Sequence, residues 1–331
     1  MTPLVETRQL SVHFPVRRGV AGKGGTVHAL DGVDLSILPG ETLGVVGESG
    51  CGKTTLSRAL LRLVPATSGS VTFDGQQISG LSGKAMKPLR RDMQLISQDP
   101  MNSLDPRMTV RQLVAEGLRI HRLARGPDLD ERVGSILASV GLRAADADRL
   151  PHQFSGGQRQ RIGIARALVL QPRFVVADEP VSALDVSVQS QVINLLVALK
   201  REFGLTYLFV AHDLAVVDYV ADRIAVMYLG KVVELGTARQ IREAPRHPYT
   251  QALLSAIPQA TQEARAQRVV LSGEVPSPLN PPSGCRFRTR CPFAQPVCAA
   301  EEPPLAADEH GHETACHFAG QVGHGAGAVG R

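Results

Sequence analysis

The 331-residue sequence predicts an α/β fold in which helices pack on a mostly parallel sheet. Three short apolar runs carry this prediction: TLGVV from Thr42, FVVA from Phe174 and TYLFVA from Thr206. Runs of this kind are typical of strands that are buried on both faces, as in parallel sheets. The first run leads through a glycine-rich loop into a helical pattern, as in an α/β unit.

The loop after the first strand is a predicted nucleotide site. GESGCGKTT matches G-x-x-x-x-G-K-[ST] and precedes the helical pattern LSRALLRLV. Its glycines let backbone N–H groups point at phosphates, Lys53 should reach the β- and γ-phosphates, and the Thr54 hydroxyl should ligate Mg²⁺. A chance glycine turn is the alternative, but strand, loop and helix are all in place. The predicted contacts are Gly47, Glu48, Ser49, Gly50, Cys51, Gly52, Lys53, Thr54 and Thr55.

Two carboxylates follow the second strand. Asp178 stands at the strand end, where an acidic residue beside a phosphate loop can hold Mg²⁺. Glu179, the next residue, is placed to polarise a water for in-line attack on the γ-phosphate. Either carboxylate alone would be an ordinary polar strand end. Together, downstream of a phosphate loop, they indicate hydrolysis.

Two more polar residues are candidates for the hydrolysis site because a phosphate loop and two carboxylates are predicted as well. Gln98 in LISQDP has an amide that suits Mg²⁺ ligation and contact with the attacking water. His212 follows the third strand and can bond to the γ-phosphate or orient the water. Each alone would more often be structural.

The stretch PHQFSGGQRQRIGIARAL contains a second predicted phosphate contact. It predicts a helix from Arg159 on, with Ser155, Gly156 and Gly157 ahead of it. A helix N-terminus carries unpaired N–H groups and partial positive charge, so it attracts anions. The residues alone leave open which anion this one holds.

The motifs GESGCGKTT, SQDP, FSGGQ, VVADEP and SALD, followed by His212, occur in the order of ABC-type ATPases, which the chain resembles except in its last residues. The resemblance implies a RecA-like core with an antiparallel β subdomain and a helical subdomain at about 99–170. It also implies two ATPase domains paired head to tail. Ser155, Gly156, Gly157 and Gln158 would then bind a γ-phosphate on the partner chain's loop, with Asp185 at the interface.

An aromatic that stacks on adenine is expected before the phosphate loop. Phe14, in LSVHFPV, is the first candidate and His13 the second, although a core role for Phe14 remains open. The Gly- and Lys-rich run from Arg17 to Thr26 is expected to be a loop between two edge strands.

Finer motifs, among them QDPMNSLDPRMTV and RHPYTQALLSAIP, are similar to the peptide and nickel importer group. FPV and EPVSALDVS resemble its second, F-type ATPase subunit. The resemblance implies a second ATPase subunit as partner, either a D-type heterodimer or a homodimer. It further implies two membrane permease subunits and, indirectly, a solute-binding protein, without nucleic acid. Dipeptide, oligopeptide, nickel and other solutes cannot be distinguished.

Two other functions stay open at this point. A soluble ABC ATPase of translation or repair is weakened by the single cassette and the lack of a heptad run. An ATP-responsive switch that barely hydrolyses is weakened by Glu179.

Four of the five cysteines, Cys285, Cys291, Cys298 and Cys316, lie close together. In a reducing compartment such a cluster favours a metal site over disulfides. The spacing C-x₅-C-x₆-C-x₁₇-C suits structural zinc or a [4Fe–4S] cluster, and His312 and His317 keep a mixed Cys/His zinc site open. Similarity to peptide-importer ATPases favours the iron–sulfur cluster.

The predicted organisation is an ABC ATPase domain at 1–243, an importer-type C-terminal extension at 244–318 and a low-complexity, disordered tail at 319–331. The net charge of +5 is modest for this length and does not distinguish a phosphate-binding protein from any mildly basic protein. No apolar run is long enough to span a membrane, and the N-terminus lacks a signal-peptide core. The chain is therefore expected at the cytoplasmic face of the membrane, held there by partners.

Overall fold

The computed structural model describes residues 2–16, 25–99, 103–257, 271 and 273–321. Of the loop predicted from Arg17 to Thr26, residues 17–24 lie outside these residues, and Gly25 and Thr26 instead begin the strand β2 (Gly25–Ile37). Residues 322–331 of the predicted tail also lie outside the described residues. Among the described residues, no helix has the length and apolarity needed to cross a bilayer.

An eight-stranded sheet forms the centre of the molecule, in the order β11-β12-β10-β9-β3-β8-β7-β6. The five strands from β9 to β6 are parallel, as predicted, and β3, β7 and β8 are buried along their whole length. The β9–β10 hairpin turns at Leu229 and Gly230, whose φ values of 45° and 80° suit a tight two-residue turn. The strands are β3 (Thr42–Val46), β6 (Met93–Ile96), β7 (Phe174–Asp178), β8 (Thr206–Val210), β9 (Arg223–Tyr228), β10 (Lys231–Thr237), β11 (Ala306–Ala307) and β12 (Glu313–Thr314).

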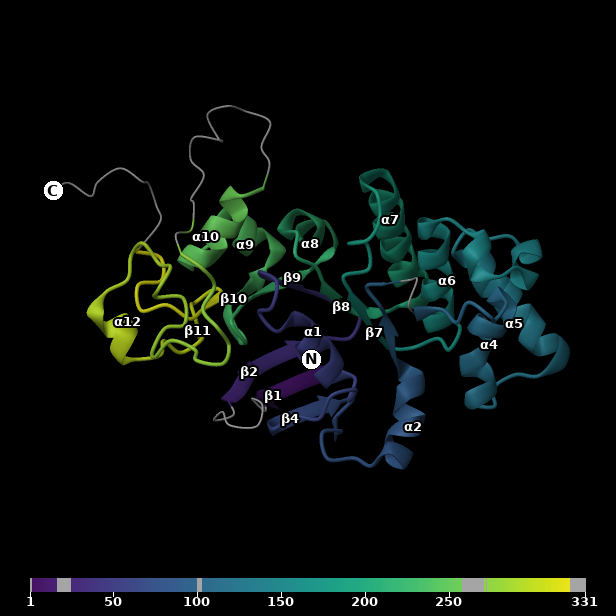
Figure 1. Cartoon of the computed structure of the whole chain (residues 1–331), viewed down its shortest axis with the longest axis horizontal. Helices are drawn as coiled ribbons and strands as arrows, with labels where there is room; N and C mark the ends of the chain where they lie inside the picture. The colour runs from purple at the N-terminus through teal and green to yellow at the C-terminus, as the bar shows by residue number, and fades with distance from the viewer. Residues whose placement is uncertain (1, 17–24, 100–102, 258–270, 272, 322–331) are drawn as a thin grey trace.

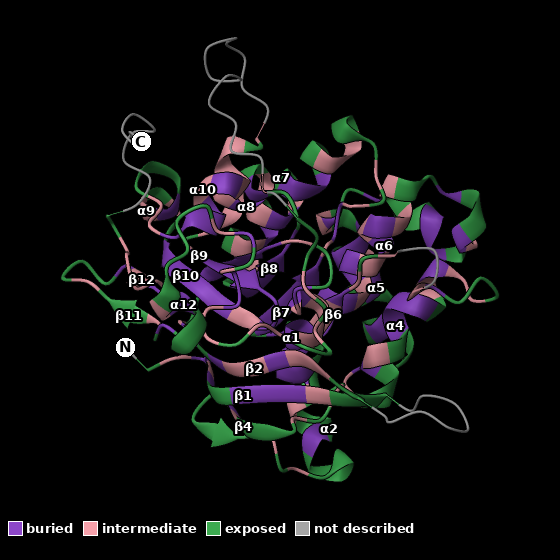
Figure 2. Cartoon of the chain, turned by 60° about the vertical axis from the view of Figure 1, so that its left-hand side comes forward, coloured by how far each residue is buried: buried purple, intermediate pink, exposed green. Residues whose placement is uncertain are grey.

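A four-stranded antiparallel sheet lies below the large sheet (Figure 2). Helix α1 (Lys53–Leu60) packs between the sheets, since it contacts β1 and β2 of one and β7 and β8 of the other. Leu56 and Leu60 of α1 are fully buried in the core that joins them. This core fixes the phosphate loop, which precedes α1, against both sheets. The antiparallel strands are β1 (Val5–Val16), β2 (Gly25–Ile37), β4 (Ser68–Phe73) and β5 (Gln76–Gln77).

The predicted helical subdomain occupies one end of the molecule, at the right of Figure 1. Its three main helices pack on one another around residues such as Leu113, Val133 and Ile162. A capping box between Thr109 and Gln112 fixes the start of the first of them. The helices are α4 (Val110–Ile120), α5 (Gly126–Ser139) and α6 (Gly156–Leu168), and α2 (Gly83–Asp92) precedes β6.

The remaining helices are α7 (Val186–Phe203), α8 (Leu214–Val220), α9 (Ala238–Glu243), α10 (Pro248–Ser255) and α12 (Pro296–Ala300). Val192, Val217 and Ile241, from α7, α8 and α9, are fully buried in the core that also holds β9. These helices cover the face of the large sheet that α1 does not.

The C-terminal extension packs against the ATPase domain and shares its central sheet and its core. Strand β12 pairs with β10 and so lengthens the central sheet. The Phe287 ring is fully buried, with centroid distances of 5.2 Å to Tyr228 and 5.4 Å to Tyr249. The predicted division at residue 243 therefore runs through a shared sheet and a shared core.

Candidate nucleotide-binding and hydrolysis site

The phosphate loop joins β3 to α1. Lys53 donates from its Nζ to the carbonyl oxygens of Gly47 at 2.7 Å and Glu48 at 3.1 Å. Gly52, the N-cap of α1, has φ of 109°, and a Cβ there would lie 2.4 Å from the carbonyl oxygen of Ala29. Only glycine fits at this position. No side chain caps α1, so its first amides remain available to an anion.

Asp178 ends β7 beside this loop and is buried. Burial raises the pKa of its carboxyl, as does the neighbouring Glu179 carboxylate, against the opposing effect of Arg58 and Lys53. Its Oδ1 is buried without a hydrogen-bond partner. A buried, unsatisfied carboxylate oxygen beside the phosphate loop fits the oxygen ligands that Mg²⁺ requires.

Gln98, Glu179 and His212 come together where β6, β7 and β8 end. The Gln98 Nε2 donates to Glu179 Oε2 at 3.0 Å, and the His212 Nδ1 lies 3.6 Å from the same oxygen. These three strands are adjacent and parallel, so their carboxyl ends meet at one edge. Glu179 has φ of 48°, a conformation that costs energy in a non-glycine residue and that often occurs at functional sites. The carboxylate is thus fixed by both its neighbours and its backbone.

The helix at the FSGGQ segment begins three residues earlier than the sequence predicts. Helix α6 starts at Gly156, and Ser155 is its N-cap. Ser155 Oγ accepts from the Gln158 N–H at 3.3 Å, while Gln158 Oε1 accepts from the Ser155 N–H at 3.0 Å. This capping box supplies two hydrogen bonds, which outweigh the poor helix propensity of two glycines. A Cβ on Gly157 would lie 2.5 Å from Val188 Cγ1, so α6 approaches α7 closely here.

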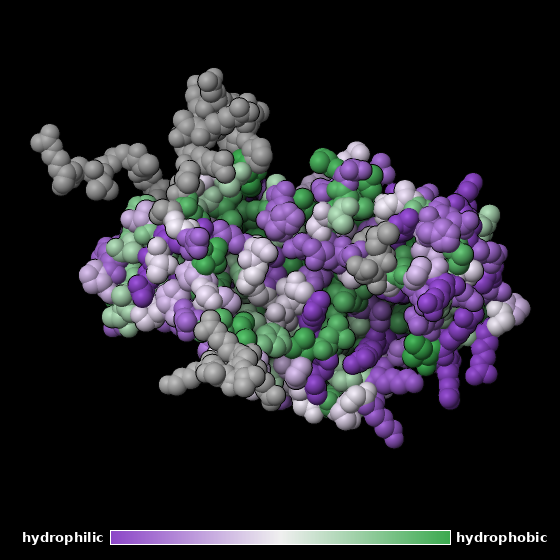
Figure 3. Space-filling view, viewed as in Figure 1, coloured by the Kyte–Doolittle hydropathy of each residue, from purple (hydrophilic) through white to green (hydrophobic). Residues whose placement is uncertain are grey.

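The start of α6 faces solvent and lies apart from the phosphate loop. Ser155, Gly156 and Gln158 are exposed, and both Figures 1 and 2 show α6 away from α1, which follows the loop. Asp185 is an exposed N-cap of α7 without a side-chain cap bond, and Val186 beside it is 79% exposed. Figure 3 shows apolar side chains on the surface over α7. This face is open to a second molecule.

The two candidates for adenine stacking differ in their surroundings. Phe14 lies near the end of β1 and is 39% exposed. His13 Nε2 lies 3.3 Å from Asp31 Oδ1, and the His13 ring packs against His28 with centroids 4.3 Å apart. The Phe14 ring is the more accessible of the two.

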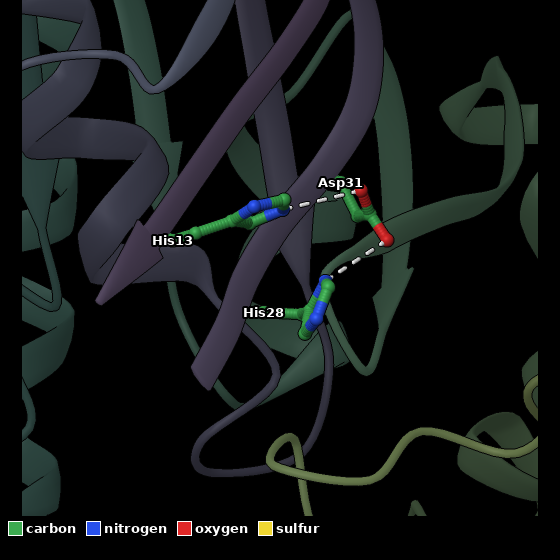
Figure 4. A group of neighbouring side chains, drawn as sticks. All are labelled: His13, His28 and Asp31. Atoms are coloured by element: carbon green, nitrogen blue, oxygen red, sulfur yellow. Dashed lines mark hydrogen bonds and ion pairs between the residues drawn. The ribbon is translucent and has the colours of Figure 1, made fainter. Parts of the chain in front are cut away.

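His13, His28 and Asp31 form a compact group, shown in Figure 4, whose ligand atoms all lie within 4.8 Å of one another. The Arg286 guanidinium bonds to the Asp31 carboxylate. Burial raises the pKa of Asp31, but Arg286 and Lys231 outweigh it, so the pKa is lowered. Two cations already neutralise this carboxylate, which makes the group a poor site for a metal cation. It joins β1 and β2 to the C-terminal extension.

All four clustered cysteines line one small cavity, together with the rings of Phe287, Phe293 and Phe318. All of them, and Cys51, are free thiols. Burial raises the pKa of Cys285, Cys291 and Cys316, that of Cys291 to about 11. Thiolates would form here only with a bound cation to stabilise them.

The two histidines considered as additional metal ligands lie in different places. His317 lines the cysteine cavity, and its Nε2 lies 3.1 Å from the Glu301 carbonyl oxygen. His312 lies in other surroundings, where its Nε2 is 2.8 Å from Glu234 Oε1 with both side chains buried.

Three residues next to the phosphate loop are not among the predicted site residues. Arg290 donates to both carboxylate oxygens of Glu48, at 2.6 and 3.0 Å. The Tyr249 hydroxyl accepts from the Glu48 N–H at 2.8 Å. Arg286 bonds to the Leu229 carbonyl as well as to Asp31. In the sequence, Arg286 and Arg290 stand in the arginine-rich stretch CRFRTRC, and Tyr249 stands in the motif RHPYTQALLSAIP.

Comparison with known proteins agrees with this geometry. The model of the ABC transporter family matches residues 30–182, and the model of the oligopeptide/dipeptide transporter C-terminal region matches 233–298. A dimeric solved structure of an ATP-binding cassette, in a post-hydrolysis state with ADP and phosphate bound, aligns with a TM-score of 0.63 and 30% identity. The alignment covers 71% of this chain and 99% of that one. The predicted ABC ATPase fold is confirmed.

Curated relatives match nearly the whole chain. The oligopeptide transport ATP-binding protein AppF of Bacillus subtilis (strain 168) is 50% identical over 319 residues, which cover 95% of this chain and 97% of the relative. The corresponding protein OppF of Salmonella typhimurium is 51% identical over 309 residues, covering 91% and 92%. The chain therefore belongs to the family of ABC transporter ATP-binding subunits, in its oligopeptide-transport group.

Proposed function

We propose that this chain is the ATP-hydrolysing subunit that powers an ABC importer of peptides or a related small solute. The observation that carries the proposal is the convergence of Gln98, Glu179 and His212 at the strand ends next to the phosphate loop. The names of the relatives, which are oligopeptide transport proteins, support the peptide class and weaken a role in translation or repair.

We propose a role for each residue that its position supports. Lys53 would exchange its bonds to the Gly47 and Glu48 carbonyls for the β- and γ-phosphates. Glu179 would accept the proton of the attacking water, while Gln98 and His212 hold its carboxylate and the water in place. Asp178, Thr54 and Gln98 would hold the Mg²⁺ that neutralises the developing phosphate charge. Phe14 would stack on adenine.

The second half of the site would come from another subunit. The exposed start of α6 is a helix N-terminus without acidic side chains in its first turn, so it can receive the γ-phosphate bound by a partner. We infer head-to-tail pairing with a homologous D-type subunit, with Asp185 at the interface; a homodimer is the alternative. Two permease subunits would hold the pair at the cytoplasmic face of the membrane.

The test is reconstitution of the chain with its partner ATPase and permease pair in liposomes. ATP added on the ATPase side should drive uptake of peptides presented by the solute-binding protein, and hydrolysis should rise when that protein is present. Hydrolysis without uptake of any peptide would reject the peptide class. Absence of hydrolysis in the complete assembly would reject the ATPase function.

For the cysteine cavity we propose a [4Fe–4S] cluster held by Cys285, Cys291, Cys298 and Cys316. Structural zinc has Zn–S bonds of about 2.3 Å, which places tetrahedral sulfurs about 3.8 Å apart. Among the described residues, which include all four cysteines, no three of these sulfur atoms lie within 4.8 Å of one another. Four thiolates that each bind a different iron would lie farther apart than four thiolates on a single zinc ion. The wider spacing supports the cluster.

Anaerobically purified protein should therefore be brown and contain about four irons per chain. The measurement is metal analysis together with the visible spectrum, and Cys298→Ser should lose both iron and colour. A colourless preparation with one zinc per chain would contradict the cluster but would still support a metal site at these cysteines. A metal-free, colourless preparation would contradict both.

A further inference from the structure

Glu48, the second residue of the phosphate loop, is held on two sides by the C-terminal extension. The Arg290 guanidinium makes a two-pronged ion pair with its carboxylate, at 2.6 and 3.0 Å. The Tyr249 hydroxyl accepts from its backbone N–H at 2.8 Å. The extension thus contacts both the side chain and the backbone of the loop.

The groups that make these contacts are firmly fixed. The Arg290 side chain is only 7% exposed, and its guanidinium lies 5.9 Å from the centroid of the Tyr228 ring. Tyr249 is fully buried, and its ring packs on Tyr228 with centroids 4.8 Å apart. Phe287 packs on both tyrosines and brings Arg290, three residues on, to the loop. Because these side chains are packed in the core, the ion pair restricts the loop rather than following its motion.

The charges at this point matter for a polyphosphate ligand. Glu48 places a carboxylate in the loop that must receive the phosphates of ATP. Arg290 neutralises that carboxylate. The Glu48 side chain is 28% exposed, so solvent screens the ion pair only in part. Without Arg290 the carboxylate would repel the phosphates and would lose the contact that fixes its direction.

We propose that Arg290 and Tyr249 are positioning residues of the nucleotide site, which hold the phosphate loop in its binding conformation and cancel the charge of Glu48. Neither residue touches the phosphates; both act through Glu48. The proposal rests on ATP binding at this loop, as proposed above. It makes the C-terminal extension part of the nucleotide site.

The test measures the affinity of the full chain for a fluorescent ATP analogue. Arg290→Met should raise the Kd about tenfold. Tyr249→Phe, which removes one hydroxyl and keeps the buried ring, should raise it about threefold, the usual effect of one hydrogen bond. Arg288→Met is the matched control, because Arg288 lies in the same segment and bonds to Ser283. It should leave the Kd unchanged.

A second substitution separates positioning from general damage to the fold. In Arg290→Met/Glu48→Gln the unpaired carboxylate is gone, so the double variant should recover most of the affinity lost in Arg290→Met. If Arg290 only stabilised the fold, the second change would restore nothing. Metal content and thermal midpoint, measured on each variant, show whether the cysteine segment stays intact.

Amide hydrogen exchange, measured without nucleotide, tests whether Arg290 restrains the phosphate loop, independently of ATP binding. The amides at 47–52 should exchange faster in Arg290→Met than in Arg288→Met. A wild-type chain that binds no ATP would reject the proposed function, while faster exchange in Arg290→Met would still support the positioning role. Unchanged exchange, together with Kd values for Arg290→Met and Tyr249→Phe within about twofold of wild type, would overturn the proposal.

Discussion

In the assembled transporter, Glu179→Gln is expected to hydrolyse ATP about 10²- to 10⁴-fold more slowly than the wild-type chain, because the water loses its general base. ATP binding should be unchanged, since Lys53, Thr54 and Asp178 are untouched. The Gln98 amide can still donate to the oxygen of the new side chain, as it does to Glu179 Oε2 now. Steady-state turnover and nucleotide affinity, measured on the same preparation, check the expectation.

The control for Glu179→Gln is Glu243→Gln. This glutamate ends α9 and pairs with Arg239 at the surface, so the same chemical change there should leave turnover as it is. Turnover of Glu179→Gln that stayed within about twofold of wild type would show that Glu179 is not the base.

The second large effect is expected from Ser155→Arg, which places bulk and positive charge on the exposed start of α6. ATP binding by the isolated chain should persist, because α6 lies away from the phosphate loop. ATP-dependent pairing with the partner ATPase should weaken by about 30-fold or more, the range for loss of a central interface contact. Crosslinking with and without ATP measures the pairing.

Ser135→Arg is the matched control for this change. Ser135 is an exposed residue of α5 in the same subdomain, and arginine there should leave pairing intact. Since Ser155→Arg also removes an N-cap, worth about 1 kcal/mol, the thermal midpoint of the isolated chain measures that separate loss. Pairing equal to wild type would refute a role for Ser155 at the interface.

The sequence predicts those parts of the site that depend on local pattern. Gln98, Glu179 and His212 each follow a short apolar strand, and parallel neighbours necessarily bring their carboxyl ends to one edge. The phosphate loop needs glycines at fixed spacing, so its residues are visible without the fold. Apolar runs therefore predict three strands of the central sheet, β3, β7 and β8, and the polar residues at their ends.

The start of α6 shows where a propensity argument misleads. Two glycines argue against a helix, and the apolar spacing on its own predicts a start at Arg159. The pattern Ser155-x-x-Gln158 is a capping-box signature, and giving it more weight would have found the start.

The contacts between the extension and the phosphate loop cannot be predicted from local sequence pattern. Arg290 in CRFRTRC has no neighbour in sequence that distinguishes it from Arg288, yet one bonds to Glu48 and the other to Ser283. Which arginine turns inward depends on how Phe287 enters the core beside Tyr228 and Tyr249. Only the three-dimensional packing contains that information.

The ion pair between Glu48 and Arg290 also determines when the site is complete during synthesis. The two residues are 242 positions apart. A ribosome that adds about 5–20 residues per second takes roughly 12–50 s to reach Arg290 after it has added Glu48. Once Tyr228 has been added, the nascent chain contains its phosphate loop and every strand of the parallel sheet, while Tyr249 and Arg290, which hold the loop, have yet to be made. The nucleotide site of this protein is therefore finished late in translation, after the sheet that supports it.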